Sequence, residues 1–425
     1  MKLQELKNKK ILILGFGREG KDTFLFLRKL FPKKVIGIAD QNPKPDLGRL
    51  KLSSGRKHFG KDYLKSLKNY EVIIKSPGIP FKTLPKPTLK KLISQTELFF
   101  DNCKDRVVGI TGTKGKSTTS AMIYEVLRAG GIKAHLVGNI GKPALSFLNK
   151  IVEKSPQRVY VYELSSHQLY SLKKSPQVAV FLNVYPEHLD YYRNFKEYAR
   201  AKANITLWQK KEDYLIYNSE DKLVSRFARK SKAKKIPIKG KYYELDKEGA
   251  RAVGEIFKIP RAIISRALKN FKYLPHRLEP VGIYRGITFY NDALATIPEA
   301  TIEAMEALGG EVETIMLGGF ERNISFKKLV KKVLKNKIKT LILFPTTGRR
   351  IWRDIVKASK RRGVPEHFFT DNMKDAVRLA YLHTKKGKIC LLSTASPSFS
   401  IFKDYEEKGN LFKKYVKQLS HEKTR

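Results

Sequence analysis

Short, continuous hydrophobic runs alternate along the chain with longer amphipathic stretches. The first run, Ile11–Leu14, is followed by a glycine-rich turn and a helical stretch through Leu30. A run that is hydrophobic at every position is typical of a parallel strand covered on both faces. Further runs that are mainly hydrophobic, and that also predict strands, are Val35–Ala39, Glu71–Lys75, Val107–Ile110, Val159–Tyr162, Val178–Leu182, Ile287–Tyr290, Thr314–Leu317, Thr340–Phe344 and Ile389–Leu392. This alternation predicts an α/β protein with mainly parallel sheets.

The order of these runs predicts three α/β domains in a row. A Rossmann-like domain is expected over residues 1–100. A central ATPase domain of the phosphate-loop type is expected over 101–277, and a second Rossmann-like domain over 278–425. A chain of 425 residues accommodates three domains of roughly 100–200 residues each.

The composition is strongly basic, with a formal net charge of +46. Such a charge raises the alternative of a nucleic-acid-binding protein. The lysines and arginines are, however, spread over the whole length, and no helix-turn-helix, zinc finger or RNP motif accompanies them. This distribution favours solvated helix faces and no specific nucleic-acid partner.

No hydrophobic run is long enough to span a membrane, and the N-terminus is too polar for a signal peptide. The two cysteines, Cys103 and Cys390, form no CxxC pair. We therefore expect a cytoplasmic protein without membrane insertion.

A glycine-rich segment, Thr111–Thr118, lies between a hydrophobic strand and a helix. A phosphate-binding loop needs glycines so that backbone N–H groups can surround an anion at a helix N-terminus. Lys116 is expected to reach phosphates, and Ser117 or Thr118 to bind Mg²⁺. The first glycine of the standard pattern is replaced by Ile110. The predicted ATP-binding residues of the loop are Gly112, Thr113, Lys114, Gly115, Lys116, Ser117 and Thr118.

A second glycine turn, Gly15–Gly20, has the spacing of a dinucleotide-binding motif, with Asp40 about twenty residues further on. The pattern predicts binding of a nucleotide or diphosphate and does not say which one. Taken alone, it also allows a nicotinamide-dependent dehydrogenase or a simple turn.

Two side chains follow predicted strands at the edge where ligands of parallel sheets collect. Glu163 comes directly after Val159–Tyr162 and is a candidate Mg²⁺ ligand, and His188 lies just past the next strand. Lys202 lies in a helical stretch, and from composition alone it reads as a surface lysine paired with Glu197.

Taken together, the motifs resemble the Mur ligase family over nearly the whole chain, and within it the branch that adds D-glutamate. The motifs that carry this resemblance are Gly15–Gly20, Ser76–Ile79, Thr111–Thr118, Gly138–Gly141, Glu163–Gln168, Asn183–Asp190, Lys202, Leu274–Arg277, Asn291–Asp292, Leu317–Gly319, Leu392–Ser398 and Gly409–Asn410.

The resemblance implies an ATP-dependent ligase that joins D-glutamate to UDP-N-acetylmuramoyl-L-alanine through an acyl phosphate, for peptidoglycan precursor synthesis. The first domain would bind the UDP moiety, the second ATP and two Mg²⁺ ions, and the third the amino acid. The enzyme would act as a monomer on these small molecules.

The resemblance also assigns residues. Lys116, Lys202 and His188 would be catalytic. Lys202 would carry a carbamate and share the metal ions with Ser117, Glu163 and His188. Arg277 and Asp292 would contact ATP. The substrate would meet Gly15, Phe16, Gly17, Arg18, Glu19, Gly20, Asp40, Ser76, Asn139 and Gln168. The D-glutamate pocket would contain Arg322, Ser398, Phe399 and Tyr405.

The chain departs from the family pattern at two places. Leu294 replaces a lysine that contacts ATP, and Tyr242–Asp246 replaces a His-Asn-x-x-Asn element, with Tyr243 in place of an asparagine. The alternatives are another amino-acid ligase of the superfamily, including a folylpolyglutamate synthase, and the basic nucleic-acid-binding protein.

Overall fold

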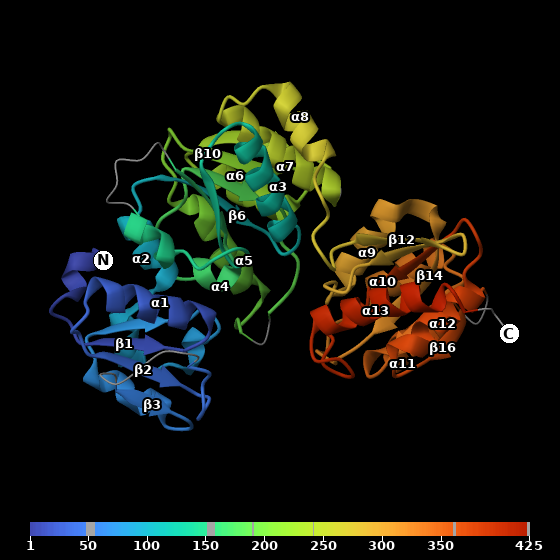
Figure 1. Ribbon diagram of the computed structural model, residues 1–425, viewed down its shortest axis with the longest axis horizontal. Coiled ribbons are helices and arrows are strands. Elements are labelled where there is room, and N and C mark those ends of the chain that lie inside the picture. Colours follow the sequence, from blue (N-terminus) through green and yellow to red (C-terminus); the bar gives the residue numbers. More distant parts are fainter. Residues whose placement is uncertain (48–55, 151–157, 189–190, 241, 360–362, 423–425) are drawn as a thin grey trace. The chain divides into compact units, whose positions relative to one another are not determined.

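A computed structural model describes residues 1–47, 56–150, 158–188, 191–240, 242–359 and 363–422 (Figure 1). The chain divides into two compact units. The N-terminal unit comprises Met1–Gly240 and Glu244–Phe271, and the C-terminal unit comprises the short segment 241–243 with residues 272–425. The N-terminal unit contains two β-sheets and the C-terminal unit contains one.

The first sheet has five parallel strands in the order β3-β2-β1-β4-β5. Its strands are β1 (Ile11–Leu14), β2 (Ile36–Asp40), β3 (Lys57–Phe59), β4 (Val72–Lys75) and β5 (Leu92–Ser94). Its helices are α1 (Arg18–Leu30) and α2 (Gln95–Asn102), with 3₁₀ turns at Leu3–Leu6, Tyr63–Asn69, Phe81–Thr83 and Lys86–Lys91. Ser94 begins α2 with a side chain that accepts a hydrogen bond from the Glu97 N–H, as expected of an N-cap.

The second sheet has six parallel strands in the order β11-β10-β9-β6-β8-β7. They are β6 (Arg106–Thr111), β7 (Ala134–Gly138), β8 (Val159–Glu163), β9 (Val178–Phe181), β10 (Tyr214–Asn218) and β11 (Lys234–Ile238). The helices are α3 (Lys116–Ala129), α4 (Ser166–Leu169), α5 (Phe195–Leu207), α6 (Lys222–Lys230), α7 (Tyr243–Ile256) and α8 (Arg261–Lys269), with a 3₁₀ turn at Leu145–Lys150. Both α3 and α5 contact the central strand β6, and apart from Arg106 at its start this strand is buried.

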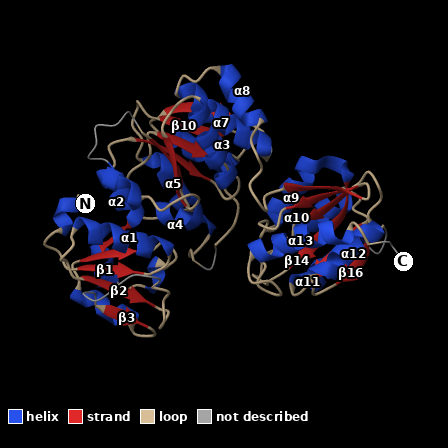
Figure 2. Cartoon of the chain, in the orientation of Figure 1, coloured by secondary structure: helices blue, strands red, loops and turns tan. Residues whose placement is uncertain are grey.

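The C-terminal unit has one six-stranded sheet in the order β12-β13-β17-β14-β15-β16, parallel except for the antiparallel edge strand β12. Helices surround this sheet, as Figure 2 shows. The strands are β12 (Glu279–Tyr284), β13 (Ile287–Asn291), β14 (Val312–Gly318), β15 (Thr340–Phe344), β16 (Glu366–Phe369) and β17 (Ile389–Leu392). The helices are α9 (Pro298–Leu308), α10 (Lys327–Lys335), α11 (Thr347–Ser359), α12 (Met373–His383) and α13 (Tyr405–Leu419), with a 3₁₀ turn at Gly309–Glu311.

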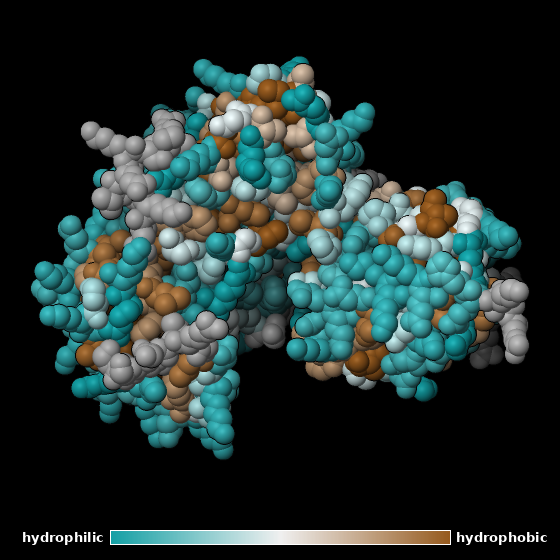
Figure 3. All heavy atoms as spheres, in the orientation of Figure 1, coloured by the Kyte–Doolittle hydropathy of each residue, from teal (hydrophilic) through white to brown (hydrophobic). Residues whose placement is uncertain are grey.

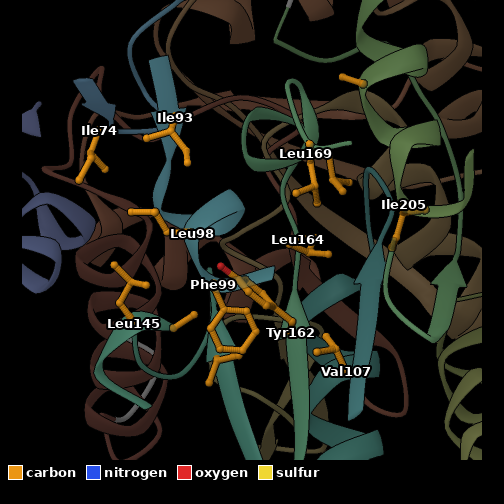
Figure 4. Packing of buried hydrophobic residues seen from close by; sticks show 14 of the residues in the cluster. Ile74, Ile93, Leu98, Phe99, Val107, Leu145, Tyr162, Leu164, Leu169 and Ile205 are labelled. Carbon is orange, nitrogen blue, oxygen red and sulfur yellow. The ribbon is translucent and has the colours of Figure 1, made fainter. Parts of the chain in front are cut away.

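One continuous hydrophobic core joins the two sheets of the N-terminal unit. Phe99 of α2 packs edge-on against Tyr162 of β8, with ring centroids 5.4 Å apart, and Leu98 and Leu145 lie in the same cluster (Figure 4). The C-terminal unit has clusters of its own, two larger ones on either side of its sheet and a smaller one made of Ala295, Ile297 and Ala300. The largest cluster of the N-terminal unit therefore spans both of its sheets, and a separate cluster that includes Leu12, Leu14 and Ile73 belongs to the first sheet alone.

The predicted α/β class with mainly parallel sheets is confirmed. Each of the three sheets lies within one of the segments expected to be a domain, but the boundaries at residues 100 and 277 remain predictions. Among the described residues, no helix is long and apolar enough to cross a membrane. Hydrophilic residues cover most of the visible face of the C-terminal unit (Figure 3).

Candidate active site

The glycine-rich segment forms the turn from β6 into α3, where the N–H groups of a first helical turn have no partner within the helix. Gly115 precedes α3 with a φ of +81°. A Cβ atom at this position would lie 2.6 Å from Asp246 Oδ1. A glycine is therefore required both by the backbone and by the approach of α7.

Asn183, just after β9, holds the loop in place. The Thr113 N–H donates to the Asn183 carbonyl oxygen over 2.9 Å, and the Lys114 N–H donates to Asn183 Oδ1 over 2.8 Å. Lys116 Nζ donates to the Thr113 carbonyl oxygen over 3.0 Å. Ser117 and Thr118 are buried at the start of α3. The loop thus has the fixed shape that a phosphate cradle requires.

Glu163 ends β8, the strand next to β6, and is fully buried. Its Oε1 accepts a hydrogen bond from Asn139 Nδ2 over 2.8 Å, and its Oε2 is buried without a hydrogen-bond partner among the described residues. A buried carboxylate oxygen with no donor suits a cation ligand, because it otherwise loses its hydration without compensation. Within the described part of the chain, no group of three His, Cys, Asp or Glu side chains is arranged to hold a metal ion.

Lys202 is not the surface lysine that composition suggests. It is 2% exposed, and its Nζ donates to the Gly112 carbonyl oxygen over 2.7 Å. Glu197 instead pairs with Arg193 and accepts a hydrogen bond from Tyr170, so the interpretation as an exposed pair with Glu197 is wrong. Burial first, and then the charge of Lys116, lower the pKa of Lys202 well below its ordinary value.

Glu187 and His167 were not singled out from the sequence. Glu187 lies 3.5 Å from Lys114 Nζ and 3.8 Å from His188 Nε2. Burial alone would raise the pKa of Glu187, but Lys114, His188 and Lys116 together lower it to about 2. The His167 and His188 rings meet with centroids 4.7 Å apart, and burial, followed by His188 and Lys202, lowers the pKa of His167 to about 3. The position of Glu187 beside His188 in the sequence was the available signal.

The first glycine turn connects β1 to α1. Gly15 has a φ of +90°, and an added Cβ would lie 2.8 Å from the Ser76 Cβ. Ser76 Oγ donates to the Gly15 carbonyl oxygen over 2.7 Å, and Asp40 Oδ2 accepts from the Phe16 N–H over 2.6 Å. Asp40 and Ser76 therefore shape the turn from neighbouring strands, and their predicted substrate contacts remain predictions.

Two further predicted substrate residues link this turn to the second sheet. The Arg18 guanidinium donates to the Asn139 carbonyl oxygen over 3.5 Å and also to that of Gly141. Gln168 Nε2 donates to Glu19 Oε1 over 2.7 Å. The turn and the Glu163 strand are thus connected through Asn139, which contacts both.

The remaining predicted residues belong to the C-terminal unit. Asp292 is 4% exposed and accepts hydrogen bonds from the Leu278 N–H and from Ser393 Oγ. The Arg277 carbonyl oxygen accepts from the Tyr243 hydroxyl. Lys408, in α13, is 1% exposed, and its Nζ donates to Thr394 Oγ1 over 2.6 Å. Burial lowers the pKa of Lys408 to about 7, against the opposing charge of Asp292.

The predicted D-glutamate residues occupy loops and one helix start in this unit. Arg322 is exposed in the segment after β14, and Phe399 is 61% exposed. Ser398 is 4% exposed, and its Oγ is buried without a hydrogen-bond partner among the described residues. Tyr405 begins α13. Of the quoted motif Asn183–Asp190, residues 189 and 190 lie outside the described residues. The roles assigned to these side chains remain predictions.

Comparison with known proteins gives concordant matches. Residues 110–256 match the Mur ligase middle domain. The chain is 31% identical to a UDP-N-acetylmuramoylalanine--D-glutamate ligase of Acetivibrio thermocellus, with 98% of each chain covered. It is 32% identical to the ligase of the same name from Ligilactobacillus salivarius, covering 99% of this chain and 98% of that protein.

The solved structure of a MurF ligase from Thermotoga maritima, in complex with ADP, aligns with a TM-score of 0.56 at 15% identity. The alignment covers 98% of this chain and 96% of that one, and at this identity it concerns the fold alone. The matches at 31–32% identity extend from one end of the chain to the other. The chain belongs to the Mur ligase family.

Proposed function

We propose that the protein is the ATP-dependent ligase that adds D-glutamate to UDP-N-acetylmuramoyl-L-alanine in peptidoglycan precursor synthesis, forming ADP and phosphate. One observation carries this proposal: the relatives of that name match over the full length, so every domain of such an enzyme has its counterpart in this chain. The glycine-rich loop before α3 and the buried carboxylate of Glu163 supply the chemistry that ATP requires.

The reaction needs activation because a carboxylate is a poor acylating agent. The alanyl carboxylate of the substrate attacks the γ-phosphate of ATP, and ADP leaves. The D-glutamate amine then attacks the carbonyl of the acyl phosphate, and phosphate leaves. The backbone N–H groups at the start of α3, which lie beyond the two that donate to Asn183, and the ammonium group of Lys116 would hold the phosphates in line. Phosphoryl transfer depends mainly on such positioning and charge stabilisation.

Glu163 would bind Mg²⁺ through its Oε2 and Ser117 through its hydroxyl, and the ion would neutralise charge on the phosphates. We infer that a second ion is bound by His188 and a carbamate on Lys202. The low pKa of Lys202 supports this inference, because only a neutral amine forms a bond to CO₂, with loss of a proton. The new carboxylate would replace a group that repels cations by one that binds them.

The C-terminal unit would supply the amino-acid pocket. Arg322 presents a guanidinium fork that matches a carboxylate of D-glutamate, and the Ser398 hydroxyl offers an unused hydrogen-bonding group. We expect the enzyme to act as a monomer in the cytoplasm, where ATP and the nucleotide substrate are available.

The test is release of phosphate, measured with UDP-N-acetylmuramoyl-L-alanine and a panel of D- and L-amino acids. Turnover should require both the nucleotide substrate and D-glutamate. Equal turnover with L-glutamate, or turnover with L-lysine instead, would assign the protein to another branch of the superfamily. Reduction of NAD⁺ with a hydroxy acid would contradict a ligase altogether.

A further inference from the structure

An acidic side chain lies inside the turn that is expected to bind a diphosphate. Glu19 is the second residue of α1, and its Oε1 accepts a hydrogen bond from Gln168 Nε2 over 2.7 Å. Its Oε2 is buried and has no hydrogen-bond partner among the described residues. An ionised carboxylate accepts hydrogen bonds at both oxygens, whereas this environment provides a donor to only one of them.

The partner of Glu19 is itself fixed. Gln168 is 2% exposed, and its Oε1 accepts from the Ser165 N–H over 2.9 Å at the start of α4. Gln168 Nε2 therefore points its N–H groups towards α1. The carbonyl oxygen of Glu19 also accepts from Gln95 Nε2 over 3.1 Å, so α2 contacts the same turn.

Charged and titratable groups face Glu19 from three elements. Arg18 and Asp22 belong to α1, Lys75 to β4, and Tyr162 to β8. The Lys75 Nζ donates to the carbonyl oxygens of Ser76 and Ile79, over 2.9 and 2.7 Å. Lys75 is thus occupied by backbone carbonyls, and no donor among the described residues reaches Glu19 Oε2.

We propose that Glu19 is a positioning residue for the diphosphate-binding turn, and that it functions as a neutral carboxylic acid held against the second sheet by Gln168. The inference rests on the proposed function and on the expectation from the sequence that Gly15–Gly20 binds the UDP moiety. A negative charge on Glu19 would oppose the diphosphate at the N-terminus of α1, whereas a neutral acid leaves the partial positive charge of the helix to the ligand. Burial raises the pKa of Glu19 to about 7 and thereby supports this assignment.

The test is calorimetric titration of the full chain with UDP at pH 6 and pH 8.5. Wild type is compared with Glu19→Gln, Glu19→Ala and the control Asp62→Asn, whose side chain is exposed. UDP changes its own charge over this range, but equally for all four proteins. From pH 6 to pH 8.5, the dissociation constant for UDP should rise about tenfold more in wild type and in the control than in Glu19→Gln. The reason is that ionised Glu19 would repel the diphosphate, and we expect this one added charge to change the affinity by about a factor of ten. Glu19→Ala, which lacks the bond to Gln168, should bind weakly at both pH values.

The outcomes separate this inference from the proposed function. Absence of UDP binding by wild type at both pH values would overturn the proposed role of the turn and the inference with it. UDP binding with the same pH dependence in wild type and Glu19→Gln would overturn the inference alone. A Glu19→Gln protein that does not fold would also overturn it, because an amide reproduces the shape and hydrogen bonds of a neutral acid.

Discussion

Lys202 donates a hydrogen bond across 2.7 Å to the carbonyl oxygen of Gly112, the first glycine of the phosphate loop. This contact joins α5 to the loop, and the Lys202 Nζ also lies 4.9 Å from the centre of the Tyr198 ring. Burial of a lysine costs free energy, because it disfavours the charged form of the side chain.

Lys202→Ala should lose nearly all ligase activity if the lysine carries a carbamate. Millimolar acetate should restore part of the activity by placing a carboxylate in the vacated space, whereas acetamide of the same size should not. The measurement is steady-state phosphate release with each additive. Full activity of the unsupplemented variant in buffer depleted of CO₂ would show that no carbamate is needed.

Lys116→Ala should reduce kcat by about 10²–10³-fold, the loss typical of removing one charge-stabilising group. Binding of UDP should stay close to wild type, because UDP is expected at the turn Gly15–Gly20 before α1 and not at this loop. Single-turnover kinetics and UDP titration on the same preparation measure the two quantities. A folded variant with near-normal kcat would show that the loop is only a structural turn.

Gly115→Ala and Gly131→Ala form a matched pair at the two ends of α3. Both glycines have positive φ, +81° and +77°, so each substitution should cost about 1 kcal/mol of stability from backbone strain. Only at Gly115 would the new methyl group meet Asp246. Gly115→Ala should therefore lose ATP affinity as well, and Gly131→Ala should retain it. Equal ATP affinity of the two variants, measured by titration with a non-hydrolysable analogue, would contradict this reading of the loop.

Arg322→Ala should raise the KM for D-glutamate by about 10–100-fold, as expected for loss of a charge-assisted hydrogen-bonded pair, and leave the KM for ATP nearly unchanged. Arg353→Ala, an exposed arginine of α11, serves as the control and should change neither constant. If the KM for ATP rises instead, Arg322 belongs to the nucleotide site.

Glu19 should also affect stability as a function of pH. Its pKa rises from about 4.5 in the unfolded chain to about 7 in the folded protein, so the folded state binds the proton more tightly. The stability that this proton supplies is present below pH 4.5 and is lost as the pH rises through 7. The loss amounts to at most about 3 kcal/mol. In Glu19→Gln, the free energy of unfolding measured with denaturant should not show this decline between pH 5 and pH 8. A decline equal to that of wild type would mean that other groups cause it.

Central strands could be predicted from the sequence because burial on both faces makes them continuously hydrophobic. The predicted bounds of β1, β15 and β17 agree with the structure. The edge strands β11 and β12 were not predicted. β11 has the sequence Lys-Lys-Ile-Pro-Ile, and β12 contains Pro280 and Gly282. An edge strand has one solvated side and tolerates such residues, so its pattern differs little from that of a loop.

The phosphate loop was predictable because its chemistry depends on neighbours in the sequence. The environment of Lys202 was not, because its burial depends on the packing of α5 against a loop ninety residues earlier. The raised pKa of Glu19 could not be predicted for the same reason, because the side chain of Gln168, which follows a strand of another sheet, contacts Glu19. Sequence patterns thus revealed which groups could act, and tertiary contacts decide their ionisation.

The large hydrophobic cluster that the first two sheets share has a consequence for how the protein melts. Phe99, Tyr162 and their neighbours belong to one cluster, so separating the two sheets would expose large aromatic side chains to water. The N-terminal unit should therefore denature as one cooperative block. The C-terminal unit, with clusters of its own, can give a separate calorimetric peak. A chain cut within the link around residue 271 should yield two soluble fragments, whereas a cut near residue 100 should produce aggregation.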